Sequence, residues 1–492
     1  MILGKGQKVE HPEYGTGTVL DILGDIARVN YYGEQLDTPV IELTWSKDYH
    51  PGITLPIDSS RIATPEERKR FRRSFEAINL GVVPPDPEHL IALTIGRKTW
   101  VPQIRSWLQN AFQDGLCKAV FGYYGAGKSH YLNLVRCVAL KEGWVVSFLE
   151  FDPKSADPAK PHLIYRNIAS SLQFPEKEDG SRTVGFPGFI KELREKWNVR
   201  SIRQSCRYLN INPWFLNAIE ILLKYPHSQD EDYISGCGWL CGENQPIQIM
   251  NNLAIRKGCS NRVPRMPRVR ETADIYVLHL VTLHHLCKAM GYKGLLILLD
   301  EAEHVRGYNV RRKERANNLF DLLARAAHPP VSGDDPPGPN DHGVAVPTFW
   351  KEGPHFGLLV GLTDGTSILP GQEIRDECVF LHNESDRIQL TPPSAIDYAR
   401  WCEIYFEMAH QQYPSQTRAL SEPTDRRTLS ELLRNAYEKT DVENRVLRNW
   451  IKLASLAPCM ALAGNADNAG EIAACLEHIA PSCGNDPLPW EY

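Results

Sequence analysis

Short alternations of apolar and polar residues fill the first 48 positions and distinguish them from the rest of the chain. Residues 18–20 and 27–31 are two of these runs, and glycines stand around them at positions 15, 17, 24 and 33. Closely spaced short strands with glycine turns are typical of a small β-barrel. The pattern therefore predicts a small β-barrel over residues 1–50.

A charged segment and a proline-rich break follow the predicted barrel. Residues 65–73 read PEERKRFRR, which is compatible with a helix, and residues 83–87 read VPPDP. Prolines at that spacing end a helix and favour an extended connection. We therefore expect residues 51–88 to form a linker with one basic helix. Its cations either contact nucleic-acid phosphates or form a solvated helix face.

Four apolar runs in the middle of the chain predict buried strands, at residues 118–121, 144–149, 294–299 and 356–362. Nearly continuous apolar runs are typical of parallel strands that are covered on both faces, and helical periodicity separates them here. The alternation predicts an α/β fold over residues 89–385, an open parallel sheet with helices on both faces.

The first of these strands leads into a glycine-rich loop with the sequence GYYGAGKS, residues 122–129. The pattern G-x-x-x-x-G-K-[ST] between a strand and a helix is that of a phosphate-binding loop, or P-loop. Backbone N–H groups face the phosphates, the lysine reaches the β- and γ-phosphates, and the serine hydroxyl ligates Mg²⁺. We therefore expect ATP and Mg²⁺ to bind at Gly122, Gly125, Ala126, Gly127, Lys128 and Ser129.

The apolar run 294–299 ends in two acidic residues, Asp300 and Glu301. In a parallel sheet, the end of this strand would lie beside the P-loop. We expect Asp300 to hold Mg²⁺ through water and Glu301 to polarise the attacking water. Thr363 directly follows the run 356–362 and is a candidate sensor hydroxyl for the γ-phosphate or for that water. The next residue, Asp364, is expected to cap a turn.

The chain between Lys128 and Asp300 is longer than a minimal sheet requires. Helical patterns predict a helical insertion over about residues 155–285. Prolines but few aromatic residues interrupt its basic segment, so that segment is either a nucleic-acid contact or a solvated loop. Its cations are Arg256, Lys257, Arg262, Arg265, Arg268 and Arg270.

Helical periodicity beyond residue 390 predicts a helical domain over residues 386–492, and two short segments resemble AAA+ ATPases. The sequence TIGR, which ends in Gly96 and Arg97, resembles the Gly-Arg box that lines the adenine pocket. Residues 443–448, ENRVLR, resemble the second-sensor segment of the AAA+ lid. The resemblance implies nucleotide contacts for Gly96 and Arg97 and a lid arginine near the γ-phosphate. We prefer Arg445 over Arg448 for that role.

Further segments resemble the ATP-binding proteins of BREX-type phage-defence systems, BrxD-like proteins among them. They are GAGKSH at 125–130 and the stretch from GYKGL at 291–295 to DEAE at 300–303. The resemblance spans roughly residues 80–455. It implies ATP binding with His130 among the loop residues, and other defence-system proteins as partners. Residues 6–19 resemble the opening of SH3-like modules of the Tudor/CarD type, which bind proteins or nucleic acid.

Composition and charge narrow the remaining possibilities. The chain is 42% hydrophobic and 23% charged, which supports packed cores, and its net charge of −5 excludes a globally basic nucleic-acid coat. No apolar run approaches the roughly 18 residues of a membrane span, and the N-terminus lacks a signal-peptide pattern. Scattered single cysteines are typical of a cytoplasmic protein, so we expect a cytoplasmic protein without membrane contact.

These patterns together favour a Mg²⁺-dependent AAA+-like ATPase that couples turnover to DNA or to a partner protein within a BREX-type system. In a homo-oligomer, an arginine finger would come from the cations after the acidic pair, which are Arg306, Arg311, Arg312, Lys313 and Arg315. One alternative is a nucleotide-gated scaffold with little turnover. Another is a superfamily-2 helicase, because DEAE resembles its Asp-Glu-Ala-x box, although no Ser-Ala-Thr element or second RecA-like lobe is recognisable.

Overall fold

The computed structural model of this chain falls into two compact units, Met1–Thr64 and Pro65–Tyr492. Among the described residues, we find no helix that combines the length and the hydropathy of a membrane span. The residues described are 8–11, 15–23, 26–31, 34–39, 44–45, 64–177, 180–196, 213–225, 230–243, 247–258, 263, 273–328, 354–363, 386–441, 445–466 and 468–484.

The first unit contains a five-stranded antiparallel sheet in the order β4-β3-β2-β1-β5. Val19, Ala27 and Val29 are buried and their neighbours Leu20 and Arg28 are exposed, so the alternation in the sequence does mark strands. The described pairings give a sheet with two edges, and its closure into an SH3-like barrel stays a prediction. The strands are β1 (Lys8–His11), β2 (Gly15–Leu23), β3 (Ile26–Tyr31), β4 (Glu34–Pro39) and β5 (Thr44–Trp45).

A six-stranded sheet in the order β11-β6-β10-β9-β7-β8 forms the centre of the second unit, and every pairing is parallel except that of β8 with β7. The predicted α/β class and the predicted strands are confirmed. The acidic strand β9 does not pair with the loop strand β6, because β10 lies between them. The strands are β6 (Cys117–Gly122), β7 (Val145–Glu150), β8 (Leu172–Gln173), β9 (Leu295–Asp300), β10 (Gly357–Thr363) and β11 (Arg387–Gln389).

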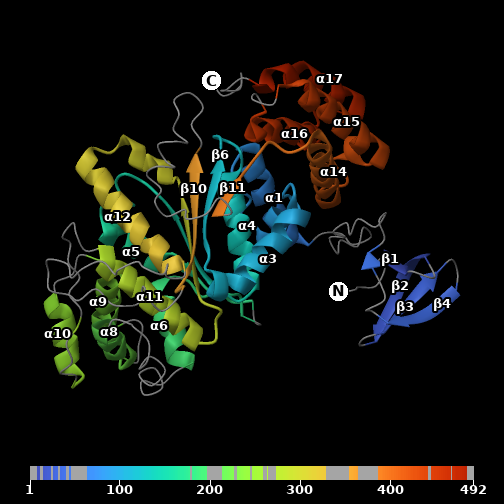
Figure 1. Cartoon of the computed structure of the whole chain (residues 1–492). Helices are drawn as coiled ribbons and strands as arrows, with labels where there is room; N and C mark the ends of the chain where they lie inside the picture. The colour runs from blue at the N-terminus through green and yellow to red at the C-terminus, as the bar shows by residue number, and fades with distance from the viewer. Residues whose placement is uncertain are drawn as a thin grey trace. The chain divides into compact units, whose positions relative to one another are not determined.

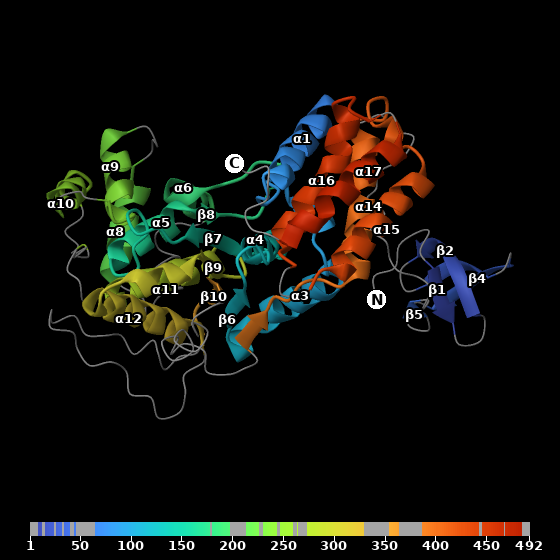
Figure 2. The same cartoon turned by 90° about the horizontal axis from the view of Figure 1, so that it is seen from above.

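Helices cover both faces of this sheet, as Figure 2 shows from above. Leu296 and Leu298 of β9 pack on one face with α2 (Pro87–Ala92), α3 (Arg97–Asp114) and α4 (Lys128–Lys141). Leu295, Ile297 and Leu299 pack on the other face with α5 (Pro161–Ser170), α11 (Ala273–Ala289) and α12 (Val310–Ala327). Alternate residues of one buried strand therefore belong to two different cores.

The predicted insertion contains helices that gather at the end of the sheet away from the C-terminal helices (Figures 1 and 2). Besides α5, they are α6 (Gly185–Lys196), α8 (Pro213–Leu223), α9 (Glu231–Leu240) and α10 (Ile247–Arg256). They share a core with α11, which is buried along most of its length and is accordingly apolar on most sides. Most of the basic segment 256–270 lies outside the described residues.

The C-terminal helices α14 (Ala395–Gln412), α15 (Pro423–Lys439), α16 (Leu447–Leu462) and α17 (Ala469–Ile479) pack against one another. Helix α1 (Pro65–Asn79) belongs to the same unit, although we expected residues 65–79 to be part of a linker. Phe71, Phe75 and Ile78 fall on one buried face of α1, and Phe75 stacks on Tyr405 with ring centroids 6.0 Å apart. The basic residues lie on the exposed face of the helix.

Candidate nucleotide-binding site

The glycine-rich loop joins β6 to α4 and curls around its own lysine. Gly125 and Gly127 have φ angles of +77° and +96°, a backbone region that residues with side chains rarely adopt. Helix α4 begins at Lys128, so its free N–H groups point into the loop. The ammonium group of Lys128 donates to the carbonyls of Gly122, at 3.2 Å, and Tyr123, at 3.4 Å.

Asp300 reaches the loop although β10 separates its strand from β6. The Asp300 side chain passes beside Gly361 of β10, where a Cβ would stand 2.6 Å from Asp300 Oδ1. It accepts a hydrogen bond from the Ser129 hydroxyl, and Lys128 lies close enough to interact with its charge. The sequence analysis did not single out Gly361. A glycine inside an apolar strand is the signal that indicates such a close approach.

The acidic pair holds protons more tightly than exposed carboxylates do. Burial raises the pKa of Asp300, against the opposing effects of the Ser129 hydrogen bond and the Lys128 charge. Burial also raises the pKa of Glu301, and the nearby charges of Glu303 and Asp300 raise it further. Raised carboxyl pKa values are typical of groups that exchange protons in a reaction.

Glu301 is held in a strained backbone conformation. With φ at +60° it is the one non-glycine residue of positive φ among those described. Its N–H donates to Asp300 Oδ1 at 3.0 Å, and the 3₁₀-helix η2 (Ala302–Gly307) follows it directly. Strain of this kind persists where the surroundings fix a residue, and it concentrates at functional sites. The turn directs Glu301 toward a cavity, which it lines.

Thr363 pairs in register with Gly122, so the predicted sensor does end beside the loop. Its hydroxyl donates to a carboxylate oxygen of Glu303. Among the described residues, Thr363 is not part of the cavity wall. Glu303, which the sequence analysis quoted only as part of a motif, therefore joins the predicted sensor to the acidic pair. Asp364 lies outside the described residues.

A cavity of about 410 Å³ lies over the loop and has a polar and an apolar part. Loop residues from Tyr124 to Ser129 and Glu301 form its polar part. The apolar part comes from α1 and the segments after it, and from the C-terminal helices. These apolar residues include Ile78, Val82, Val83, Leu93, Ile95, Trp100, Trp401, Leu447 and Ile451. This division suits a nucleotide, whose phosphates and base need opposite surroundings.

Of the residues that we expected to bind nucleotide outside the loop, Gly96 and His130 line this cavity and Arg97 does not. Arg97 donates instead to the carbonyl of Ala92 at 2.9 Å. His130 Nε2 lies 2.8 Å from the hydroxyl of Thr94, which itself donates to a backbone carbonyl, so the imidazole is the donor. Burial lowers the pKa of His130 to about 4, and its ring is neutral near pH 7.

The two arginines that the sequence analysis considered for the lid have different surroundings. Arg445 donates to the carbonyls of Thr440 and Glu438, both at 2.9 Å, and so caps the C-terminal end of α15. Arg448 lines the cavity and donates to the hydroxyl of Tyr124 at 2.6 Å. The structure thus places Arg448 at the cavity and Arg445 away from it, whereas the sequence analysis preferred Arg445.

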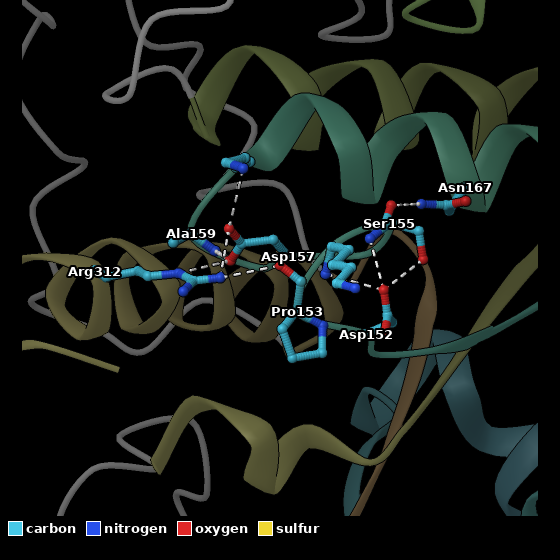
Figure 3. Close-up of polar contacts among 9 residues, drawn as sticks. Asp152, Pro153, Ser155, Asp157, Ala159, Asn167 and Arg312 are labelled. Atoms are coloured by element: carbon cyan, nitrogen blue, oxygen red, sulfur yellow. Dashed lines mark hydrogen bonds and ion pairs between the residues drawn. The ribbon is translucent and has the colours of Figure 1, made fainter. Parts of the chain in front are cut away.

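One predicted arginine-finger candidate is engaged within the chain. Arg312 of α12 contacts the buried carboxylate of Asp157 at 2.9 Å and donates to the carbonyl of Pro153 at 3.2 Å. Figure 3 shows this contact and, beside it, Asp152 accepting hydrogen bonds from Ser155 in the same loop after β7. The neighbouring Arg311 is exposed to solvent. Nothing is described of the Arg306 side chain.

Comparison with known proteins agrees with this site. Residues 67–207 and 266–327 match the model of the family described as BREX system ATP-binding protein BrxC/D. Over these residues the chain is similar to this family. The resemblance seen in the loop and DEAE segments is thereby confirmed. The match includes the P-loop, the acidic pair and α12, and it begins within α1. No curated protein matches the chain.

The residues present fit Mg²⁺ as well as phosphate. The Ser129 hydroxyl and the Asp300 carboxylate are hydrogen-bonded at the mouth of the loop, and both are hard oxygen donors of the kind that Mg²⁺ prefers. Positive charge for the phosphates comes from Lys128 and from the N-terminus of α4. The arrangement can therefore bind a magnesium nucleotide and place a carboxylate, Glu301, beside it.

Proposed function

We propose that this protein binds Mg²⁺-ATP over residues 122–129 and hydrolyses it. The observation that carries the proposal is the meeting of Lys128, Ser129 and Asp300 around the loop, with Glu301 turned into the same cavity. The match to the family of BREX system ATP-binding proteins supports the identity of the nucleotide.

Each residue has a chemical role in this proposal. The amides of the loop and Lys128 bind and orient the phosphates, and Ser129 and Asp300 hold Mg²⁺, which neutralises phosphate charge. Glu301 accepts a proton from the attacking water, which its raised pKa favours. Thr363 and Glu303 form a hydrogen-bonded pair that fixes the end of β10 relative to the acidic pair.

The proposed architecture is AAA+-like, with residues 386–492 as a lid. Its support is the contact of Arg448 and Leu447 with the same cavity as the loop. In this interpretation Arg448, rather than Arg445, contacts the γ-phosphate. The position of the lid then depends on which nucleotide is bound. The basic face of α1 and the segment 256–270 are the proposed contacts to DNA, and Arg311 is an exposed arginine available to a neighbouring subunit in a homo-oligomer.

The proposed setting is a cytoplasmic, BREX-type defence system in which other system proteins are the partners. ATP turnover would control engagement of DNA or of those proteins. A nucleotide-gated scaffold remains the second candidate function, because binding of ATP requires the loop alone and hydrolysis requires Glu301. For the helicase alternative, the described part of the second unit offers a single six-stranded sheet and no second lobe.

The test of this function compares Lys128→Ala with Lys141→Ala, an exposed lysine at the other end of the same helix. We expect Lys128→Ala to lose most ATP affinity and to abolish phage protection in cells that carry the whole system. Lys141→Ala should retain both. Full protection by Lys128→Ala would contradict a role for the nucleotide. Phosphate release with and without DNA over a salt series would test coupling, because phosphate contacts weaken steeply with salt.

A further inference from the structure

The P-loop carries a tyrosine that binds the lid arginine. Tyr124 occupies one of the variable positions of the loop pattern, and its side chain is 61% exposed within the loop. Arg448 donates to its hydroxyl at 2.6 Å, and the guanidinium carbon lies 4.6 Å from the centre of its ring. In the proposed function the loop binds phosphate through backbone amides and Lys128, which gives the ring of Tyr124 no assigned role.

The rest of Arg448 is fixed by the same group of residues. Its N–H donates to the carbonyl of Gly125 at 3.3 Å, in the loop itself. Its side chain passes over Gly81, where a Cβ would stand 2.9 Å from Arg448 Cγ. Gly125 thus binds the backbone of Arg448, Gly81 packs against the aliphatic part of its side chain, and Tyr124 binds its guanidinium. All four of these residues line the cavity.

The partner of the guanidinium is neutral. In the described part of the chain, no carboxylate lies within ion-pair distance of Arg448. A tyrosine hydroxyl and an aromatic face orient a guanidinium without cancelling its charge. The positive charge therefore stays available to an anion in the cavity while the side chain is already ordered, which lowers the entropic cost of a later contact.

We infer that Tyr124 is a positioning residue that holds the Arg448 guanidinium at the mouth of the nucleotide cavity, ready for the phosphates of ATP. The inference rests on the proposed function. The inference goes beyond that function in one respect: the loop binds the nucleotide through its backbone groups and also binds the proposed lid through the side chain of Tyr124. Tyr124 acts only through Arg448, so an effect of replacing Tyr124 should require the presence of Arg448.

The experiment is a double-mutant cycle on full-length protein with Tyr124→Phe, Arg448→Ala and the double variant, followed by kcat/KM for ATP and by ATP affinity. Tyr124→Phe keeps the ring and removes one hydrogen bond to a charged group, so we expect a loss of about 3- to 10-fold. In the Arg448→Ala background the same change should alter either quantity by less than about 2-fold. Arg448→Lys, which cannot stack as a planar group, should not restore activity.

Tyr233→Phe is the matched control. Tyr233 and Arg194 form another stacked and hydrogen-bonded tyrosine–arginine pair, in the helical insertion. We expect this variant to retain kcat/KM. An equal effect of Tyr124→Phe with and without Arg448 would overturn the inference. Lys128→Ala separates the two proposals: if it abolishes ATP binding while the cycle shows no coupling, the function stands and the role of Tyr124 does not.

Discussion

Gly361 and Asp300 lie so close that a Cβ on the glycine would stand 2.6 Å from Asp300 Oδ1. This contact explains how Asp300, at the end of β9, reaches the loop that follows β6 although β9 and β6 are not paired. Strand β10 intervenes between the two, and the carboxylate crosses it where the strand has no side chain. Any larger residue at position 361 would compete with Asp300 for the same space.

We therefore expect Gly361→Ala to displace Asp300 from Ser129. The variant should need several-fold more Mg²⁺ for half-maximal ATP binding, and crowding of a packed strand should cost roughly 1–3 kcal/mol of stability. Gly357→Ala is the control, because a Cβ there would also stand 2.6 Å from a neighbour, Leu296, far from the acidic end of the strand. A Mg²⁺ requirement that changes equally in both variants would contradict this role for Gly361.

The proposed hydrolysis should depend on pH through the raised pKa of Glu301. A carboxyl with a raised pKa takes up its proton at a higher pH than usual and then cannot accept one from water. The acid limb of kcat/KM should therefore lie above the ordinary glutamate value of 4.5, since kcat/KM reports groups of the free enzyme. A pH–rate profile that stays flat down to that value would exclude Glu301 as the base.

The stability of the folded protein should also depend on pH, through Asp300. Ionisation of this carboxyl lowers stability. Because burial raises the pKa of Asp300 above its unfolded value, ionisation at neutral pH costs the folded state free energy. This penalty is absent well below the unfolded pKa and grows as pH rises toward the folded pKa. Asp300→Asn should therefore raise the melting temperature at pH 7 and lose this advantage at low pH. An equal melting temperature at every pH would contradict the assignment.

Replacement of Arg448 and of Arg445 should separate activity from stability. Arg448→Ala removes a cation from the cavity and should lower kcat/KM for ATP by about 10-fold or more. Arg445→Ala removes a cap on the carbonyls of α15 and should cost about 1 kcal/mol of stability with activity retained per folded molecule. Thermal unfolding measured beside ATPase rates checks both, and an inactive but stable Arg445→Ala protein would restore our first preference.

Arg312 should prove structural. Among the described residues, Arg312→Ala leaves buried Asp157 with Lys160, at 3.6 Å, as its one ion-pair partner, so we expect a loss of roughly 2–4 kcal/mol in denaturant unfolding. Arg311→Ala, an exposed change on the same turn, should be neutral within about 0.5 kcal/mol. If Arg312→Ala leaves stability unchanged yet removes turnover, Arg312 is the finger and its contact with Asp157 is incidental.

Much of the core could be predicted from the sequence because its signals are local. The loop glycines, the lysine and the acidic pair follow buried strands, and strand ends meet at one edge of a parallel sheet. The order of the strands is not a local property, and no pattern in the run 356–362 indicates that β10 separates β6 from β9. The role of Gly361 depends on that order.

The predicted lid segment shows the same limit of prediction from sequence. The sequence of residues 443–448 contains two arginines three positions apart, and it does not indicate which of them faces the cavity. That choice depends on where α15 ends, since its free carbonyls engage Arg445. Likewise, the charged run at 65–73 indicates a helix but not that Phe71 and Phe75 pack it onto the C-terminal helices.

Phosphate release by Glu301→Gln tests the central claim most directly. The wild-type protein should bind Mg²⁺-ATP and release phosphate. Glu301→Gln should bind ATP within about 3-fold of wild type and release phosphate at least about 100-fold more slowly, because the amide cannot accept the proton of water. Phosphate release by the variant at the wild-type rate, or wild-type protein that does not bind ATP, would contradict the account.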